Sequence, residues 1–108
     1  MILDNVNPND LFPTEKKGPS VLGIMDYQVQ GQSQFEGAFI ATSECLIMNV
    51  DMNGQFYYRN IGYDEVNEIE YDGETIIFNF NIGKIPMHDF KSNEVQAFVD
   101  FVKDKIQA

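Results

Sequence analysis

The chain has 108 residues, 44% of them hydrophobic, and a formal net charge of −10 at pH 7 because 17 acidic residues outweigh seven basic ones. This length carries a single hydrophobic core, and so large an apolar fraction excludes a disordered chain. The negative charge disfavours polyanionic partners, so we expect neither nucleic-acid binding nor attraction to an anionic membrane surface.

The remaining composition points to a reducing cytoplasm. Cys45 is the single cysteine and cannot form an intrachain disulfide. The apolar runs are too short for a transmembrane helix, so we expect no stable membrane insertion. Met1–Asp4 lacks the basic region and long apolar stretch of a secretory signal. No phosphate-binding glycine-rich loop occurs, so we expect no cofactor.

Two regions are expected along the chain, an N-terminal segment over residues 1–19 and one domain over residues 20–108. Three prolines, Pro8, Pro13 and Pro19, argue against a continuous helix in the first region. Seven strands are then predicted: Val21–Val29, Gln34–Thr42, Cys45–Val50, Gln55–Ile61, Val66–Tyr71, Glu74–Ile82 and Lys84–Asp89.

Turn and breaker residues separate these strands. Asn53–Gly54 and Asp72–Gly73 are two-residue hairpin signals, since these residue types tolerate positive φ. Gly37 predicts a bulge or a bend within its strand. Pro86 cannot donate to a ladder, so the seventh strand is predicted to lie at a sheet edge or to carry a break.

A helix is predicted over residues 93–107, with Ser92 as its N-cap. Its apolar residues recur at helical spacing, which is more typical of a core-facing stripe than of a partner-binding surface. The stripe consists of Val95, Phe98, Val99, Val102 and Ile106. The fold class is therefore mainly β, of the α+β type: a seven-stranded antiparallel β-barrel or sandwich capped by a C-terminal α-helix.

Residues 20–108 resemble the bacterial pleckstrin-homology (PH) domain, especially its GRAM-type and short YokE-like branches. In Phe39–Met48, Thr42 is followed by polar residues and then by a Leu–Ile pair. In Ile61–Ile69, Tyr63 and two acids lead into two aliphatic residues three positions apart. The resemblance implies a PH-like fold, in which two near-orthogonal sheets are closed at one corner by the last helix.

The chain departs from the lipid-binding members of that fold. Those members hold phosphoinositide headgroups with lysine and arginine from the first two strands and their loop. Here the loop is Gln30–Ser33, and no lysine or arginine occurs between Lys17 and Arg59. A phosphorylated headgroup needs several charge-assisted hydrogen bonds, so phosphoinositide binding is not expected.

The residues with catalytic potential are few. Cys45 lies in an apolar run and is predicted to be a buried, inert thiol, and His88 a surface imidazole. One histidine with one cysteine does not make a zinc site. Glu68 and Glu70 alternate with apolar residues, which is typical of a solvated strand face. We therefore predict no catalytic residues, no metal site and no enzyme activity. Cys45 and His88 side by side in a solvent-filled pocket would revive the enzyme hypothesis.

Two function hypotheses remain. The first is a non-enzymatic interaction module that binds a protein partner or itself through an exposed sheet edge or an aromatic patch. Tyr57 and Arg59 share one strand face and are its candidate surface residues, although an outward tyrosine could also pack under the N-terminal segment. The alternative is a lipid or small-ligand binder that uses a site outside the usual loop, where Arg59, Lys84 and Lys91 are the available bases.

Overall fold

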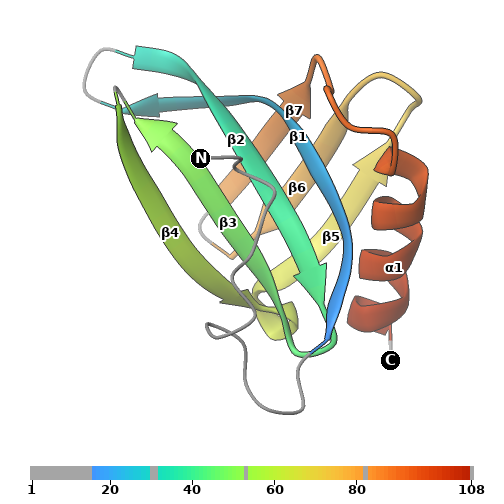
Figure 1. Ribbon diagram of the computed structural model, residues 1–108. Coiled ribbons are helices and arrows are strands. Elements are labelled where there is room, and N and C mark those ends of the chain that lie inside the picture. The colour runs from blue at the N-terminus through green and yellow to red at the C-terminus, as the bar shows by residue number, and fades with distance from the viewer. Residues whose placement is uncertain (1–15, 30–31, 53, 82, 108) are drawn as a thin grey trace.

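The computed structural model describes residues 16–29, 32–52, 54–81 and 83–107. Predictions about residues 1–15, Gln30–Gly31, Asn53 and Ile82 lie outside the described residues. The strands are β1 (Lys17–Val29), β2 (Gln32–Thr42), β3 (Cys45–Met52), β4 (Gln55–Gly62), β5 (Val66–Tyr71), β6 (Ile76–Phe80) and β7 (Gly83–His88). A short 3₁₀ helix, η2 (Tyr63–Glu65), joins β4 to β5, and α1 (Val95–Gln107) follows β7 (Figure 1). No helix in this described part is long and apolar enough to cross a membrane.

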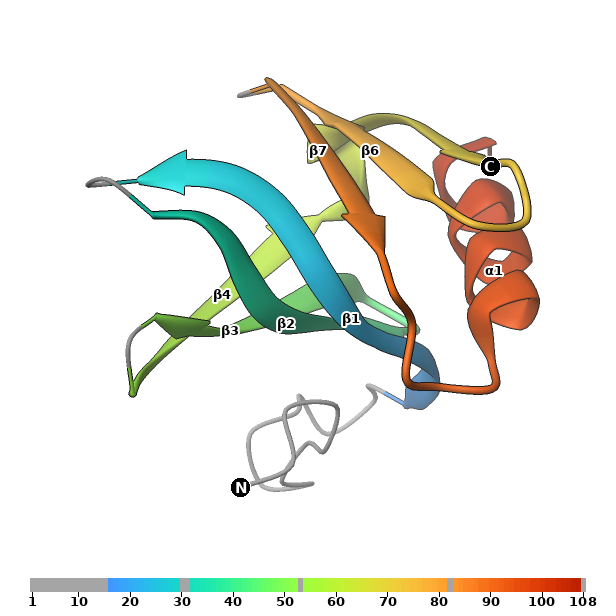
Figure 2. The ribbon, with the colours of Figure 1, turned by 90° about the horizontal axis from the view of Figure 1, so that it is seen from above.

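The seven strands form one antiparallel sheet in the order β4-β3-β2-β1-β7-β6-β5. The sheet bends so that the half containing β5, β6 and β7 stands at an angle to the half containing β1 to β4, and α1 lies at one end between them (Figure 2). This arrangement confirms the predicted class of seven antiparallel strands with a C-terminal helix. It leaves β4 and β5 at the two ends of the strand order.

Aromatic rings form the centre of the core. The rings of Phe39 and Phe78 lie 4.2 Å apart, those of Phe78 and Phe80 lie 5.4 Å apart and stack, and Phe98 of α1 meets Phe78 edge-on at 6.1 Å. Ile76, Phe78 and Phe80 alternate along β6 and are all buried. The core therefore joins both halves of the sheet to the helix.

The helix packs as predicted but begins differently. Val95, Phe98, Val99 and Val102 are buried, so the stripe is core. Ser92 is not the N-cap, because its hydroxyl accepts a hydrogen bond from the Leu22 amide of β1 at 3.2 Å. The first helical hydrogen bond runs from the Phe98 amide to the Glu94 carbonyl, which puts Glu94 at the N-cap position.

Of the bulge or bend predicted at Gly37, the bulge is wrong. The pairing of β2 with β1 and β3 runs without interruption through this residue. A Cβ atom there would lie 2.5 Å from Sδ of Met25 and 3.1 Å from the carbonyl oxygen of Asn49. Gly37 is needed for close packing rather than for a backbone irregularity. The irregularities in the pairing of β1 with β2 lie instead between Lys17 and Ser20 and between Asp26 and Val29. The strand also starts earlier than predicted, at Lys17.

Of the two alternatives predicted for the seventh strand, an edge position or a break, the edge position is wrong, since β7 lies between β6 and β1. Its pairing with β1 covers only Met87 and His88, opposite Met25 and Ile24. These two pairs begin directly after Pro86, so the proline lies outside the short β1–β7 ladder. The seam between the two halves of the sheet therefore has few backbone pairs.

The two residues at the tip of the β5–β6 turn are Gly73 and Glu74, one position later than the predicted Asp72–Gly73, because Asp72 pairs with Thr75. The Asp72 carboxylate accepts hydrogen bonds from the amides of Glu74 and Thr75, at 2.9 and 2.8 Å. Gly73 has a φ of 97° inside this turn. Because the turn uses Glu74 and Thr75, β6 starts at Ile76 rather than at Glu74.

The two segments that carry the family resemblance meet in space. The Thr42 hydroxyl accepts hydrogen bonds from the amides of Glu44 and Cys45 and donates to the Cys45 carbonyl, so it organises the β2–β3 turn. The Tyr63 hydroxyl of η2 donates to the Thr42 carbonyl at 2.6 Å. A threonine and a tyrosine 21 residues apart thus hold the connection between β4 and β5 against the end of β2.

Candidate functional site

A groove with a volume of about 580 Å³ separates β5 from the last turn of α1. Residues 67–71 of β5 form one wall, and Lys103, Ile106 and Gln107 form the other. Successive side chains of a strand point to opposite faces. A groove that touches five consecutive residues must therefore follow the edge of the strand. Its volume lies within the range of about 300–1,000 Å³ that is usual for ligand sites.

The backbone of β5 has hydrogen-bonding groups on that edge. Among the described strands, β5 pairs with β6 alone. The Asp72 amide donates to the Thr75 carbonyl at 3.3 Å, in the same register as the β5–β6 ladder. Hydrogen-bonded and non-hydrogen-bonded pairs alternate in an antiparallel ladder. Ile69 and Tyr71 therefore direct their N–H and C=O groups away from β6, towards the open edge.

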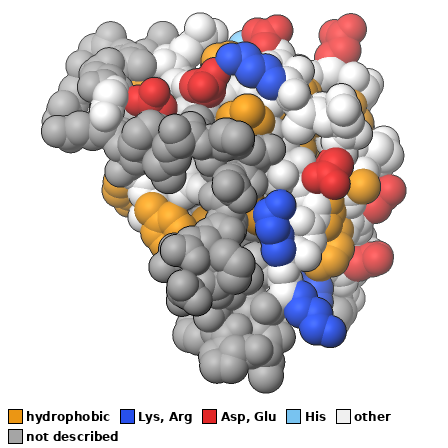
Figure 3. Space-filling view, in the orientation of Figure 1, with side chains coloured by type: hydrophobic (Ala, Val, Ile, Leu, Met, Phe, Trp, Pro, Cys, Tyr) orange, Lys and Arg blue, Asp and Glu red, His pale blue; other side chains and the backbone are white. Residues whose placement is uncertain are grey.

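Carboxylates flank this edge. Glu68 and Glu70 are exposed on the outer face of β5, as their alternation with apolar residues predicts, whereas Ile69 between them is buried. Among the residues that the structure describes, Lys103 is the one basic residue that lines the groove. On the face seen in Figure 3, lysine and arginine side chains are separated from one another and form no patch. The strand side of the groove is thus acidic, whereas the helix side combines one basic, one apolar and one uncharged polar residue.

The predicted surface residues lie at the other end of the sheet. Tyr57 is 47% exposed on β4, and so is its neighbour Tyr58. Tyr57 lies opposite the buried Val50, on the core side of the strand, and owes its exposure to the terminal position of β4. Arg59 donates to the Glu65 carboxylate of η2 at 3.3 Å. Neither Tyr57 nor Arg59 lines the groove.

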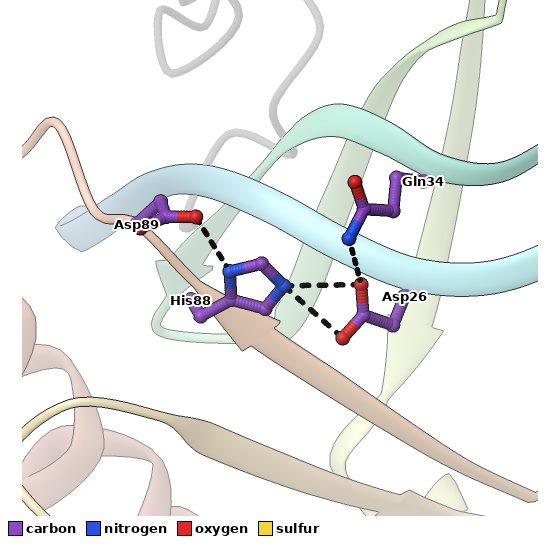
Figure 4. Close-up of polar contacts among 4 residues, drawn as sticks. All are labelled: Asp26, Gln34, His88 and Asp89. Atoms are coloured by element: carbon purple, nitrogen blue, oxygen red, sulfur yellow. Dashed lines mark hydrogen bonds and ion pairs between the residues drawn. The ribbon is translucent and has the colours of Figure 1, made fainter.

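A second polar cluster crosses the β1–β7 seam on the outer face of the sheet (Figure 4). The His88 ring lies between two carboxylates, with Nδ1 2.8 Å from Oδ2 of Asp89 and Nε2 3.0 Å from Oδ1 of Asp26. Gln34 of β2 donates to the same Asp26 carboxylate at 3.1 Å. The cluster thus connects three strands through side chains where the backbone ladder is short.

The geometry of this cluster favours the imidazolium form of His88. Only the protonated ring can donate from both nitrogens, and each nitrogen faces a carboxylate oxygen. The hydrogen bonds to Asp26 and, second, to Asp89 raise the pKa of His88 above its ordinary value. The ring is 26% exposed, so the predicted surface imidazole is in fact half-buried and anchored on both sides.

Cys45 and His88 do not form a nucleophile–base pair. Cys45 is half-buried, not fully buried as predicted, and it lies beside Thr42, which pairs with Lys17 of β1. His88 pairs with Ile24, seven residues further along β1, which is roughly 23 Å at 3.3 Å per residue. Within the described ranges, no three histidine, cysteine, aspartate or glutamate side chains are placed to hold a metal ion.

The sequence identified the acidic residues of β5 but not the groove beside them. The alternation of Glu68 and Glu70 indicates a solvated face, and nothing in it says which strand ends the sheet. The Asp26–His88 contact joins residues 62 positions apart. The adjacent pair His88–Asp89 was the one local signal of that cluster.

Comparisons with known proteins identify the fold but no function. No protein-family model matches the chain, and no curated protein matches it. The chain is similar in structure to the C-terminal domain of an unknown protein from Leishmania infantum, with a TM-score of 0.57 and 17% sequence identity over 85% of each chain. At this identity the similarity supports the fold alone.

Proposed function

We propose that this chain is a non-enzymatic interaction module of the bacterial PH type, which works in the cytoplasm and binds an extended segment of a protein partner. The partner segment adds as a further strand to the edge of β5, in the groove between β5 and α1. The observation that carries this proposal is the groove itself, which follows five consecutive residues of a terminal strand. Strand addition of this kind draws its affinity from main-chain hydrogen bonds and its specificity from the flanking side chains.

Two features of the edge support strand addition. Ile69 and Tyr71 offer backbone donors and acceptors on the groove side, and a paired strand would satisfy them. Neither residue needs to move, because both side chains point to the core and stay packed there. Self-association through two copies of this edge is disfavoured, since Glu68 and Glu70 of each copy would face one another.

The alternative of a lipid or small-ligand site is not supported by any comparable observation. Of its three candidate bases, Arg59 is paired with Glu65 and Lys91 with Glu36. Lys84 is exposed on β7. A headgroup site needs several cations that converge on one point, and these three lie on different elements.

The proposal is tested by selecting twelve-residue peptides from a displayed random library on the immobilised full chain. Selected peptides are then titrated into ¹⁵N-labelled protein, and the backbone amide shifts are mapped. We expect the largest changes at Ile69, Tyr71 and the last turn of α1. Changes confined to β4, or to the seam around His88, would overturn the assignment of this edge.

A matched pair of variants separates groove binding from other contacts. Gln107→Trp places a bulky ring in the groove, whereas Ala97→Trp places the same ring at an exposed helical position that does not line it. We expect Gln107→Trp to weaken peptide binding at least tenfold and Ala97→Trp to leave it within twofold. Equal affinities for both variants would contradict the proposal.

A further inference from the structure

We propose that the segment bound at β5 carries lysine or arginine at alternate positions, with uncharged apolar residues between them. This inference rests on the proposed function and adds the chemistry of the partner. It follows from the charges on the two sides of the groove, which differ.

The outer side of the edge selects for cations. In an antiparallel pair, the Cβ atoms of directly opposed residues on one face lie about 4.5–5.5 Å apart, and opposite charges there are favourable. Glu68 and Glu70 are two residues apart on the outer face of β5 and are both exposed. A strand paired to β5 therefore places two of its own alternate side chains within reach of these carboxylates.

The helix side selects against cations. Residues of the added strand that alternate with the first set point to the opposite face, towards the last turn of α1. Lys103 and the half-buried Ile106 line that wall. A cation there would meet the Lys103 ammonium, whereas a β-branched apolar side chain would cover Ile106. The two sides together define a pattern of cation, apolar residue, cation.

Long-range electrostatic attraction also favours a cationic partner, but it does not specify where on the surface the partner binds. The chain carries a net charge of −10, so any cationic peptide is drawn to it at low salt. The inference concerns the two carboxylates beside the groove, and its test must separate them from the remaining acids.

The test uses three nine-residue peptides with valine at the odd positions and lysine, glutamine or glutamate at the even positions. Each peptide is titrated into the full chain by calorimetry at about 50 and 200 mM salt, and the binding site is mapped by amide shifts. We expect the lysine peptide to bind at least tenfold more tightly than the glutamine peptide, and the glutamate peptide to bind most weakly. The preference should persist at the higher salt.

Two double variants remove equal charge. Glu68→Gln with Glu70→Gln neutralises the edge, and Glu44→Gln with Asp100→Asn neutralises two exposed acids that do not line the groove. We expect the first pair to weaken the lysine peptide about fivefold and the second less than twofold. Equal losses in both pairs would overturn the inference, because they would indicate diffuse attraction.

The outcomes distinguish the inferred charge preference from the proposed function, which is strand addition at β5. If the glutamine peptide binds as tightly as the lysine peptide and both shift the amides of β5, the charge preference is wrong and strand addition stands. If none of the three peptides shifts the β5 amides, while library peptides likewise fail to do so, both are wrong.

Discussion

Raising the pH from 6 to 8.5 is expected to destabilise the protein through His88. The folded state raises the pKa of this imidazole above the value of about 6.5 found in unfolded chains. A group of this kind contributes its full stability below the unfolded pKa and loses that contribution as the pH rises through the folded pKa. The free energy of unfolding should therefore fall across this window.

The size of the effect follows from the exposure of the cluster. Asp26 is 39% exposed and Asp89 77% exposed, so solvent screens both ion pairs, and each contributes about 0.2–1 kcal/mol. The expected total loss is about 1 kcal/mol, most of it from Asp26, the larger contributor to the pKa shift. This is a measurable fraction of a typical unfolding free energy of about 5–15 kcal/mol.

The assay is urea denaturation at half-unit steps of pH for the parent chain, His88→Gln and Asp26→Asn. The difference in unfolding free energy between the parent and His88→Gln should shrink by about 1 kcal/mol over the window, and Asp26→Asn should lower the pKa of His88 measured by NMR. The control Asp100→Asn removes an exposed acid outside the cluster and should leave that pKa unchanged. Parallel pH profiles for the parent and His88→Gln, or a measured His88 pKa at or below 6.5, would refute the reasoning.

Three further changes test the packing. Phe78→Ala removes the ring at the centre of the core and should cost about 3–5 kcal/mol of unfolding free energy in urea denaturation; a loss below about 1 kcal/mol would contradict the role of this ring. Gly37→Ala forces a Cβ against Met25 and should cost about 1–3 kcal/mol, and a neutral result in thermal melts would show that Met25 yields. Thr42→Val removes the hydroxyl that organises the β2–β3 turn and should cost about 1–2 kcal/mol, whereas an exposed change such as Glu44→Gln should stay within about 0.5 kcal/mol.

Local patterns determined the elements of this chain. Alternation over Ile76, Phe78 and Phe80 predicts a strand with one buried face, and all three side chains are buried. The apolar spacing from Val95 to Val102 predicts the buried face of the helix. These signals are reliable because a period of two or of 3.6 residues reflects which side chains share a face, whatever the strand or helix packs against.

Capping and breaker residues predicted the structure less well, because their side chains or strands interact with groups distant in the sequence. Ser92 has the chemistry of an N-cap, yet its hydroxyl binds the amide of Leu22, 70 residues away. Pro86 suggests an edge strand or a break, and β7 lies inside the sheet while its ladder with β1 starts only after the proline. In both cases the tertiary partner, not the local preference, decided the outcome.

By itself the sequence determined the number of strands and their approximate positions along the chain, the final helix with its buried face, and the acidic character of β5. Only the tertiary structure decided the order of strands in the sheet, and with it the identity of β5 as a terminal strand beside α1. It also brought Asp26 and His88 together across the β1–β7 seam. The physical reason is that periodicity reports which side of an element is buried. The edge of a sheet, and a contact between residues 62 positions apart in the sequence, depend instead on which elements become neighbours.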